Sequence, residues 1–462
     1  MTTKFENGLF IFRRDLRIVD NNGLNLLNEK CKNIFTIFIF TPEQVGSGNK
    51  YKSENSVQFM IESLQDLASQ INKSGGHLYT FYGHNDKVVA DCIKAFDINV
   101  VCFNLDISPY AKERDEKIIK LCEHMKTYIM YDYDYYLCNP GEVLNGAGET
   151  YKKFTSYYNT AKKLKVEKPA GKRHLSLKKS DAHIPNKISL DEAMKKFIGN
   201  ENPDILVHGG RQEAIKQMRI AAKNIQHYEK SRDELSKPTS QLSSYIKFGN
   251  ISIREVYYAF KNNHAFIRQL YWRDFYSGVL YSFPRVLGHS LNPKYDKIKW
   301  HHNERLFEAW CKGITGIPIV DASQRQLLAT GWTHNRGRMI SSSILIKILL
   351  IDWRKGEQFY AQHLVDYDVA SNNGGWQWSS GSGADSQPFF RYFNPYTQSK
   401  DHDKDCEYIK KWIPELRSVD SDDIHNWDTA WEKHKDIKYP KPIVDYKDQR
   451  EKSIKMYKDA LY

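Results

Sequence analysis

Short apolar runs alternate with amphipathic stretches over the first part of the chain. The amphipathic stretches repeat apolar residues at helical spacing over 53–71, 86–96 and 111–122. A continuous apolar run is typical of a strand buried on both faces of a parallel sheet. Such runs are GLFIF (8–12), NIFTIFIF (33–40), HLYTFY (77–82) and INVVCF (98–103), and the aromatic stretch 127–137 follows as a fifth strand. This alternation predicts a doubly wound, Rossmann-like α/β domain with a parallel sheet.

The first predicted strand is not followed by a phosphate-binding glycine motif. Dinucleotide-binding domains of the common type carry Gly-x-Gly-x-x-Gly at this turn, where the glycines let the backbone approach a pyrophosphate. This chain has FRRDLRIVDN there instead. We therefore do not expect the α/β domain to bind a dinucleotide in the usual way.

The composition changes twice further along the chain. From about 160 to 205 it is rich in Lys, Ser, Pro and Asn without periodicity, which predicts a long solvated connection. The basic residues of this connection could touch DNA, although a solvated linker is the simpler interpretation. From about 205 onward the pattern is helical. We expect an α/β domain at 1–140, an interdomain connection at 141–205 and a large all-α domain at 206–462.

Cysteine usage and hydropathy place the chain in a broad class. The 7 Cys are scattered without a CxxC pair, which argues for reduced thiols and against a metal site. The N-terminus has no apolar run typical of a signal peptide. ILIKILLI (344–351) is interrupted by Lys347 and too short to cross a bilayer, so it is predicted to be a buried helix segment. We expect a soluble, intracellular protein that is not secreted and does not enter a membrane.

Charge and aromatic content suggest a partner. The chain has 68 Lys+Arg against 56 Asp+Glu, a net charge of +12. This balance fits a nucleic-acid partner, because phosphate contacts supply much of that binding energy, but a merely soluble basic protein explains it equally well. The 10 Trp and 29 Tyr exceed ordinary core needs and point to stacking surfaces or redox stations.

Two helical segments carry faces that are too polar for a core. In TGWTHNRGRM (330–339), helical spacing places Trp332, Asn335, Arg336 and Met339 on one face. In AFIRQLYWRDFY (265–276), the same spacing groups Gln269, Trp272, Arg273 and Tyr276. A core stripe would be aliphatic, so both faces are expected to hold a flat, anionic and partly apolar partner.

Three further features suit a large cofactor that carries phosphates. Thr239 and Ser240 precede a predicted helix, whose N-terminus could hold an anion, although ordinary helix capping also explains them. DYDVASNNGGWQW (366–378) places carboxylates and amides before an expected Gly-Gly turn, where they could hydrogen-bond a heterocycle. Arg338 needs a partner such as Asp366. Three tryptophans, which could also be ordinary core residues, stand apart from both faces: Trp300, Trp353 and Trp376.

The chain resembles the photolyase/cryptochrome flavoproteins, and among them the cyclobutane pyrimidine dimer (CPD) photolyases. The resemblance covers nearly the whole chain. It is carried by FIFRRDLRIVDN, HYEKSRDEL, PTSQLSSYIKFGNIS, RQLYWRDFY, KGITGIPIVDASQRQLLATGWTHNRGRM, LLIDWRKGEQFY, DYDVASNNGGWQWSSGSGADSQPFFRYFNPYTQ and YPKPIVDYKDQREKSIKMYKDAL.

The resemblance implies an α/β antenna domain and a helical domain that binds FAD. Light excites the reduced flavin, which passes one electron to a pyrimidine dimer that has been flipped out of UV-damaged DNA; the ring splits and the electron returns. The positions that match cofactor-binding residues are Tyr228, Thr239, Ser240, Gln241, Leu242, Ser243, Arg338, Asp366, Tyr367, Asp368 and Asn372, the last beside flavin N5.

The resemblance also implies a lesion site and an electron relay. Catalytic positions are Asn335, Met339, Gln269 and Asn372, and Trp300, Trp353 and Trp376 match the relay that photoreduces flavin. The matches to DNA-binding and lesion-binding positions are Arg232, Gln269, Trp272, Tyr276, Asn335, Arg336, Met339, Trp378 and Gln398. The chain is expected to act as a monomer.

The choice of lesion rests on the helix that carries Asn335 and Met339. Photolyases of (6-4) photoproducts have two histidines at these positions for proton transfer. Asn and Met there are typical of CPD photolyases. Gln269 departs from this pattern, because CPD photolyases usually carry Glu. The alternatives are a cryptochrome-like blue-light photoreceptor without repair activity and a (6-4) photolyase.

Three other positions depart from the family pattern. Phe266 replaces a Trp near the flavin, and Gly337 is unfavourable inside a helix. Ala111 stands where folate-binding members carry Glu. Folate is therefore disfavoured as a second antenna chromophore, and the candidates are a deazaflavin, a flavin or folate, or no antenna at all.

Overall fold

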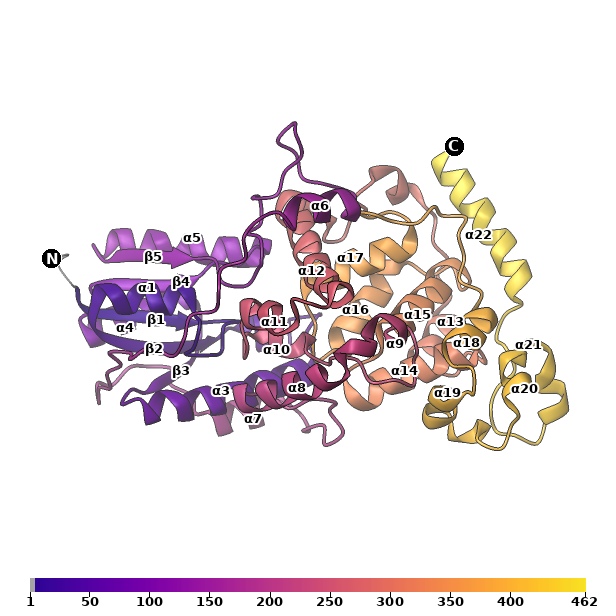
Figure 1. Ribbon diagram of the computed structural model, residues 1–462, viewed down its shortest axis with the longest axis horizontal. Coiled ribbons are helices and arrows are strands. Elements are labelled where there is room, and N and C mark those ends of the chain that lie inside the picture. Colours follow the sequence, from indigo (N-terminus) through magenta and orange to yellow (C-terminus); the bar gives the residue numbers. More distant parts are fainter. Residues whose placement is uncertain (1–4) are drawn as a thin grey trace.

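The computed structural model describes residues 5–462, and its first part is a five-stranded sheet (Figure 1). All neighbouring strands pair in parallel, in the order β3-β2-β1-β4-β5. From β1 the sheet thus grows first to one side, through β2 and β3, and then to the other, through β4 and β5. This strand order confirms the prediction of a doubly wound sheet. The strands are β1 Phe5–Phe12, β2 Cys31–Phe40, β3 Leu78–Tyr82, β4 Val100–Asn104 and β5 Tyr128–Asp132.

Helices cover both faces of the sheet. Alternate residues of each strand point to opposite faces, so Phe10 packs with α1 and α3 while Ile11 packs with α4 and α5. Both faces are therefore buried, which explains why the strands are apolar without interruption. The helices of this part are α1 Asn22–Lys30, α2 Pro42–Val45, α3 Glu54–Lys73, α4 Asn85–Phe96 and α5 Pro109–His124.

The predicted connection is more structured than its composition suggests. It runs over the α/β part, where Ile34 N donates to Ser176 O at 2.8 Å and Ile188 N donates to Thr80 O at 3.0 Å. It also forms two helices, α6 Phe154–Ala161 and α7 Leu190–Phe197. Apolar residues at helical spacing, such as Phe154, Tyr157 and Ala161, anchor it. The connection thus runs over the surface of the α/β part and includes two helices that its composition did not indicate.

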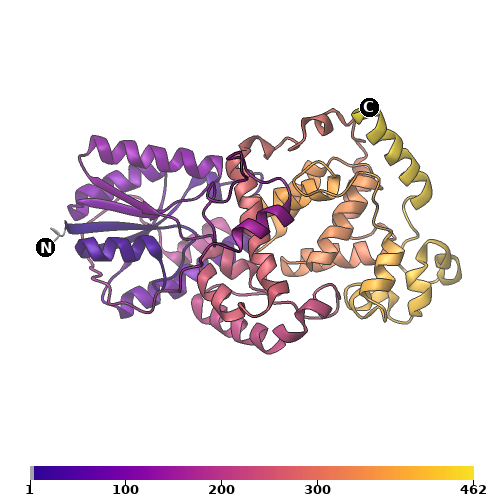
Figure 2. The same cartoon turned by 45° about the horizontal axis from the view of Figure 1, so that its top comes forward.

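The remainder of the described chain is helical, as predicted, and lies beside the sheet in both ribbon views (Figures 1 and 2). Its helices are α8 Arg211–Asn224, α9 Tyr228–Ser231, α10 Ser243–Phe248, α11 Ile253–Phe260, α12 His264–Ser282, α13 Glu304–Lys312, α14 Pro318–Thr330, α15 Asn335–Lys347, α16 Trp353–His363, α17 Val369–Ser380, α18 Pro395–His402, α19 Glu407–Trp412, α20 Ser421–His425, α21 Trp427–Ala430 and α22 Tyr446–Leu461.

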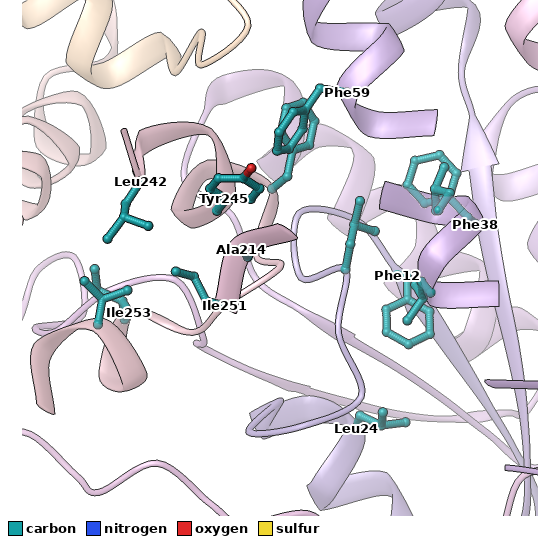
Figure 3. Packing of buried hydrophobic residues seen from close by; sticks show 14 of the residues in the cluster. Phe12, Leu24, Phe38, Phe59, Ala214, Leu242, Tyr245, Ile251 and Ile253 are labelled. Atoms are coloured by element: carbon teal, nitrogen blue, oxygen red, sulfur yellow. The ribbon is translucent and has the colours of Figure 1, made fainter. Parts of the chain in front are cut away.

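One hydrophobic core joins the sheet to the helical part. Figure 3 shows Phe12 and Phe38 of the sheet in the same cluster as Tyr245 of α10 and Ile253 of α11. Buried ion pairs reinforce this junction: Arg254 of α11 pairs with Asp20 at 3.0 Å and with Asp134 at 2.7 Å. The two parts therefore have no solvated gap at this point.

The segment ILIKILLI is only partly helical. α15 ends at Lys347, and the next four residues are buried but not helical, with Leu350 at φ 59°. The Lys347 ammonium donates to Arg391 O at 2.7 Å, which satisfies a charge that the core would otherwise exclude. Within residues 5–462, no helix is long and apolar enough to cross a membrane.

Candidate functional site

Asn335 and Met339 lie together on the first turn of α15. His334 caps the helix by accepting from Arg336 N at 3.1 Å, and Asn335 Nδ2 approaches Met339 Sδ to 3.5 Å. Asn335 is exposed and Met339 is half-buried. Trp332 precedes the helix and is buried, so its predicted place on this face is wrong. Burial lowers the pKa of His334 to about 4, so this neighbouring imidazole is neutral at pH 7.

Two glycines permit close packing of the helices that carry the site. A Cβ on Gly337 of α15 would come 2.7 Å from Ser323 Oγ of α14, which explains a glycine that helix propensity disfavours. A Cβ on Gly374 would come 2.2 Å from the Tyr276 ring of α12. The predicted Gly-Gly turn is wrong, because Asp368 caps α17 and this helix continues through both glycines. α17 packs against α12, α15 and α16.

All four residues predicted on the α12 face stay partly exposed: Gln269, Trp272, Arg273 and Tyr276. Trp272 stacks on Phe154 of α6 with ring centroids 3.8 Å apart and an interplanar angle of 7°. Phe154 lies in the predicted connection 141–205, far from α12 along the chain, so the sequence did not indicate this contact. One face of Trp272 is therefore covered by Phe154, while the side chain as a whole stays partly exposed.

Arg273 faces away from this group. Its Nη1 donates to Tyr135 O at 2.5 Å, and its guanidinium lies 5.4 Å from the centre of the Tyr136 ring. Its neighbour Asp274 accepts from the backbone of Leu137 and Cys138. The expectation that Arg273 joins the polar face is wrong, because it binds the end of the α/β part instead.

The predicted pair of Arg338 and Asp366 is present. Arg338 Nη2 lies 3.0 and 3.1 Å from the two carboxylate oxygens, and Nε donates to Thr333 O at 2.9 Å. Asp366 is buried and Arg338 is partly exposed. The pair neutralises a buried carboxylate while leaving part of the guanidinium accessible.

Asn372 and Asn373 are held by one residue of α16. Asn372 Nδ2 donates to the backbone oxygen of Glu357 at 3.0 Å, and Asn373 Nδ2 donates to its carboxylate at 2.9 Å. Burial raises the pKa of Glu357 to about 7, against the hydrogen bond from Asn373. Glu357 thus fixes the orientation of both amides, a role that no local pattern indicated.

The segment 239–243 forms a turn that leads into α10. Gln241 adopts φ 52°, and Gln217 Nε2 donates to Ser240 O at 2.9 Å, which shapes the turn before α10. Across the described residues, no side chain caps α10 at Leu242, and the buried Ser244 Oγ has no hydrogen-bond partner. Donors without partners at a helix start suit an anion. Tyr228 packs edge-on against Phe266, with ring centroids 5.4 Å apart.

The three candidate relay tryptophans differ in exposure. Trp376 and Trp353 are buried, whereas Trp300 is partly exposed. Trp376 also contacts Tyr360 and Trp310, at centroid distances of 5.1 and 6.0 Å. These two neighbours were not singled out from the sequence, since an isolated aromatic residue in a helix gives no sign of its partner.

Two candidate DNA-contacting residues lie on α17 and α18. Trp378 is partly exposed, with its ring centroid 6.4 Å from that of Phe393. Gln398 Oε1 is buried and has no hydrogen-bond partner within the described part of the chain. α18 packs against α15, which brings Gln398 to the same side of the fold as the α15 residues.

A cavity of about 240 Å³ opens where the chain order of the sheet reverses. Arg14, directly after β1, pairs with Asp368 at 2.8 Å and with Asp106 at 3.4 Å. Arg14 and further cations hold the pKa of Asp368 well below its usual range, against the effect of burial. Lys247 and Tyr367 also line the cavity. Tyr367 and Asp368 thus line this cavity, whereas Asp366 pairs with Arg338.

A metal centre has no candidate ligands here. Among residues 5–462, no group of three or more His, Cys, Asp or Glu side chains is placed to hold an ion.

Two family profiles match the chain. One is described as DNA photolyase and covers residues 9–173. The other, the FAD binding domain of DNA photolyase, covers residues 266–459. Together they span the sheet and most of the helical part.

Relatives match over the full length. The deoxyribodipyrimidine photo-lyase of Synechococcus sp. is 33% identical, over 98% of this chain and 96% of that protein. The crystal structure of an archaeal photolyase from Sulfolobus tokodaii with two FAD molecules has a TM-score of 0.88 and 37% identity, over 98% of this chain and 100% of that one. A bacterial class III photolyase from Agrobacterium tumefaciens has a TM-score of 0.91 and 30% identity, over 100% and 98%.

Proposed function

The chain belongs to the DNA photolyase family, and from this premise we propose that it repairs UV-damaged DNA by splitting cyclobutane pyrimidine dimers with light. The observation that carries the choice of lesion is the exposed start of α15, where Asn335 and Met339 lie side by side. Neither an amide nor a thioether titrates near pH 7, so this face offers no acid for a (6-4) photoproduct. Opening a cyclobutane ring requires no such acid.

The helical part carries the cofactor FAD, which supplies the chemistry by absorbing light in its reduced form and exchanging one electron with the dimer. Tyr228 and the segment 239–243 would hold its phosphates and the adjoining groups. Arg338 and Asp366 would act together at the ring system, where the paired guanidinium compensates negative charge. Asn372, held by Glu357, would offer its amide oxygen to the flavin, because its Nδ2 already donates to Glu357 O.

A flipped dimer fits the group of residues on α12, α15 and α17. Trp272, fixed from behind by Phe154, and Trp378 form aromatic walls, with Tyr276 beside Trp272. Rigid walls replace part of the stacking that the bases lose when they leave the duplex. Gln269 hydrogen-bonds the dimer. Arg232, Arg336 and Gln398 hold the strand on either side of it.

The tryptophans carry electrons to the flavin site when the cofactor is oxidised. The order Trp376, Trp353, Trp300 runs from buried to partly exposed side chains. Arg354 lies 5.0 Å from the Trp353 ring, so a positive hole is disfavoured there and moves on to Trp300. Exposure to water then stabilises the charge at the end of the relay.

The interdomain cavity is the site of a second chromophore. Arg13, Arg14, Arg114 and Lys247 outnumber Asp106 and Asp368 along its lining, which favours an anionic ligand. The structure from Sulfolobus tokodaii, which holds two FAD molecules, supports a flavin over a deazaflavin or folate. Ala111 is absent from the described lining, and an alanine there could not hydrogen-bond folate in any case.

A monomer with an α/β domain at 1–140, a connection at 141–205 and a helical FAD-binding domain at 206–462 acts in the compartment that holds the DNA. The packing of α6 and α7 supports treating the connection as a structural part of both domains.

Gln269 is the residue that favours an alternative. Its Nε2 donates to Ala265 O at 3.3 Å, a weak contact within its own helix, and the chain has an amide where CPD photolyases usually have a carboxyl group. A blue-light photoreceptor without repair activity would carry such a residue without cost.

A repair assay with two lesions separates these functions. The flavin-loaded, reduced protein is illuminated with oligonucleotides that contain either one cyclobutane thymine dimer or one (6-4) photoproduct. We expect intact thymines from the first oligonucleotide and no change in the second. Repair of the second oligonucleotide would overturn the assignment of the lesion, and repair of neither would favour the photoreceptor.

A further inference from the structure

Two arginines that we assign to DNA binding share one carboxylate in the free protein. Arg336 Nη2 of α15 lies 2.8 Å from Asp233 Oδ1, and Arg232 Nε lies 3.8 Å from Asp233 Oδ2. Both cations, and then His402, lower the pKa of Asp233, against its partial burial. The carboxylate is therefore ionised and neutralises one of two positive charges.

This arrangement leaves donors unused. In the described part of the chain, the Nε atoms of Arg232 and Arg336 are buried and have no hydrogen-bond partner. The Asp233 side chain is 39% exposed, so solvent or a ligand can reach it. Leu235 N donates to His402 O at 2.9 Å, which ties the loop of Asp233 to α18, the helix of Gln398. The site thus combines excess positive charge with an accessible anion that can be displaced.

We propose that Asp233 is a specificity-determining residue that occupies the place of a DNA phosphate until a lesion is flipped. The inference rests on the proposed function. In the free protein, the carboxylate holds both guanidinium groups in position. A phosphate of either duplex lies beside Arg232 and Arg336, but only the binding of a flipped dimer supplies the free energy with which this phosphate replaces the carboxylate.

Discrimination follows from this competition. Undamaged DNA is not flipped, so its phosphates do not displace Asp233 and gain nothing from the two arginines. Without the carboxylate, undamaged DNA gains the whole phosphate contact. Damaged DNA makes this contact in the wild-type protein already. Its binding free energy therefore improves only by the amount that was spent on displacing Asp233. Removing the carboxylate must therefore raise the affinity for undamaged DNA more than the affinity for the lesion.

The test compares Asp233→Asn with Asp401→Asn in the flavin-loaded protein in the dark. Asp401 is exposed on the neighbouring α18 and has no ion pair within 4.0 Å among residues 5–462, so its variant controls for the change in net charge. Binding to a duplex with one thymine dimer and to the identical undamaged duplex is measured by fluorescence anisotropy over a series of salt concentrations.

We expect Asp233→Asn to tighten binding to undamaged DNA about threefold to fivefold relative to Asp401→Asn, as for one partly exposed ion pair. The slope of log K against log salt should steepen by about 0.9 for undamaged DNA, the value for one added phosphate contact. Binding to the dimer should change less. Adding Arg336→Gln to Asp233→Asn should abolish these effects.

If Asp233→Asn and Asp401→Asn changed the DNA affinity equally, the change in net charge alone would explain the result, and the inference would be overturned. Weaker binding by Asp233→Asn, with unchanged thermal stability, would mean that the carboxylate only supports Arg336 and would also overturn it. Failure of the proposed function gives a different result, because the wild-type protein itself would then bind both duplexes equally.

Discussion

Gln269 is the single residue whose chemistry most directly affects repair. It lies half-buried on α12, one turn before Trp272, and its amide makes only a weak contact with Ala265 O at 3.3 Å. A carboxyl group at this place could hydrogen-bond the dimer and support the negative charge that develops on it during splitting. We therefore expect this residue to affect the yield of the reaction rather than the choice of lesion.

Gln269→Glu should raise the quantum yield of dimer repair, by up to about twofold. The yield is measured under single-wavelength illumination with the dimer oligonucleotide in excess. Gln362→Glu, an exposed glutamine of α16, serves as the control and should have no effect. An unchanged or lower yield for Gln269→Glu would show that the amide is already the better group.

Lys247 makes the interdomain cavity sensitive to pH. Burial lowers the pKa of Lys247 to about 7, with Arg14 adding to this effect and Asp368 opposing it. The ammonium is charged below this pKa and loses its charge above it. Binding of FAD as a second, anionic ligand should therefore weaken about fivefold between about pH 6 and pH 8.5.

The measurement is a titration of flavin-loaded protein with further FAD, followed by fluorescence. Lys247→Met should remove this pH dependence, whereas Lys50→Met, an exposed lysine that does not line the cavity, should keep it. Tighter binding at higher pH would contradict the role given to Lys247.

At the scale of the elements, local periodicity predicted the helices well and their ends poorly. Asn335 and Met339 fall on one face of α15, as their spacing indicates. Trp332 does not, because Gly331 ends α14 at φ 67° and His334 starts the next helix. Gly331 ends a helix, whereas Gly374 and Gly375 lie inside one. The sequence does not distinguish these two uses of glycine, because tertiary packing determines whether the helix continues.

Contacts between elements were beyond the sequence. Phe154 stacks on Trp272, although the two residues are 118 positions apart in the chain. No local sequence pattern indicates that these rings are partners. Asp233 reaches Arg336 across a similar separation. The sequence thus supplied the kinds of groups at the site, and the packing of the helices supplied which group faces which.

The contact of α17 with α12 depends on Gly374. Gly374→Ala would place a Cβ 2.2 Å from the Tyr276 ring. The position of a Cβ is fixed by the backbone, so relieving this overlap requires the helix or the ring to shift. We expect a loss of unfolding free energy of about 2 kcal/mol despite the better helix propensity of alanine. Chemical denaturation measures the change.

Gly278→Ala in α12 is the matched control. Among the described residues nothing lies within 4 Å of the added Cβ, so the variant should be stabilised by about 0.5–1 kcal/mol. Equal effects of the two substitutions would contradict the close packing of these helices.

At the scale of the whole molecule, the sheet and the helical part behave as one unit. The hydrophobic core is continuous between them, and Arg17 and Arg254 meet Asp134 at the junction with almost no exposure. The cavity that we propose for a second chromophore lies at the same junction. A rigid junction would keep the two chromophores at a fixed separation.

Asp134→Asn should lower the unfolding free energy by about 3 kcal/mol, because it leaves two buried guanidinium groups short of a partner. Glu6→Gln, which removes an exposed ion pair with Lys32, should change it by less than about 1 kcal/mol. Thermal unfolding followed by circular dichroism compares the two. A loss below about 1 kcal/mol for Asp134→Asn would show that the junction does not depend on this network.

The most direct test of light-driven repair is an action spectrum. The reduced, flavin-loaded protein is mixed without oxygen with an oligonucleotide that contains one cyclobutane thymine dimer, and recovery of intact thymines is followed in the dark and at a series of wavelengths. We predict no recovery in the dark and a rate in the light that follows the absorption of the reduced flavin and of any second chromophore. Recovery in the dark, or none at any wavelength while the dimer is bound, would contradict it.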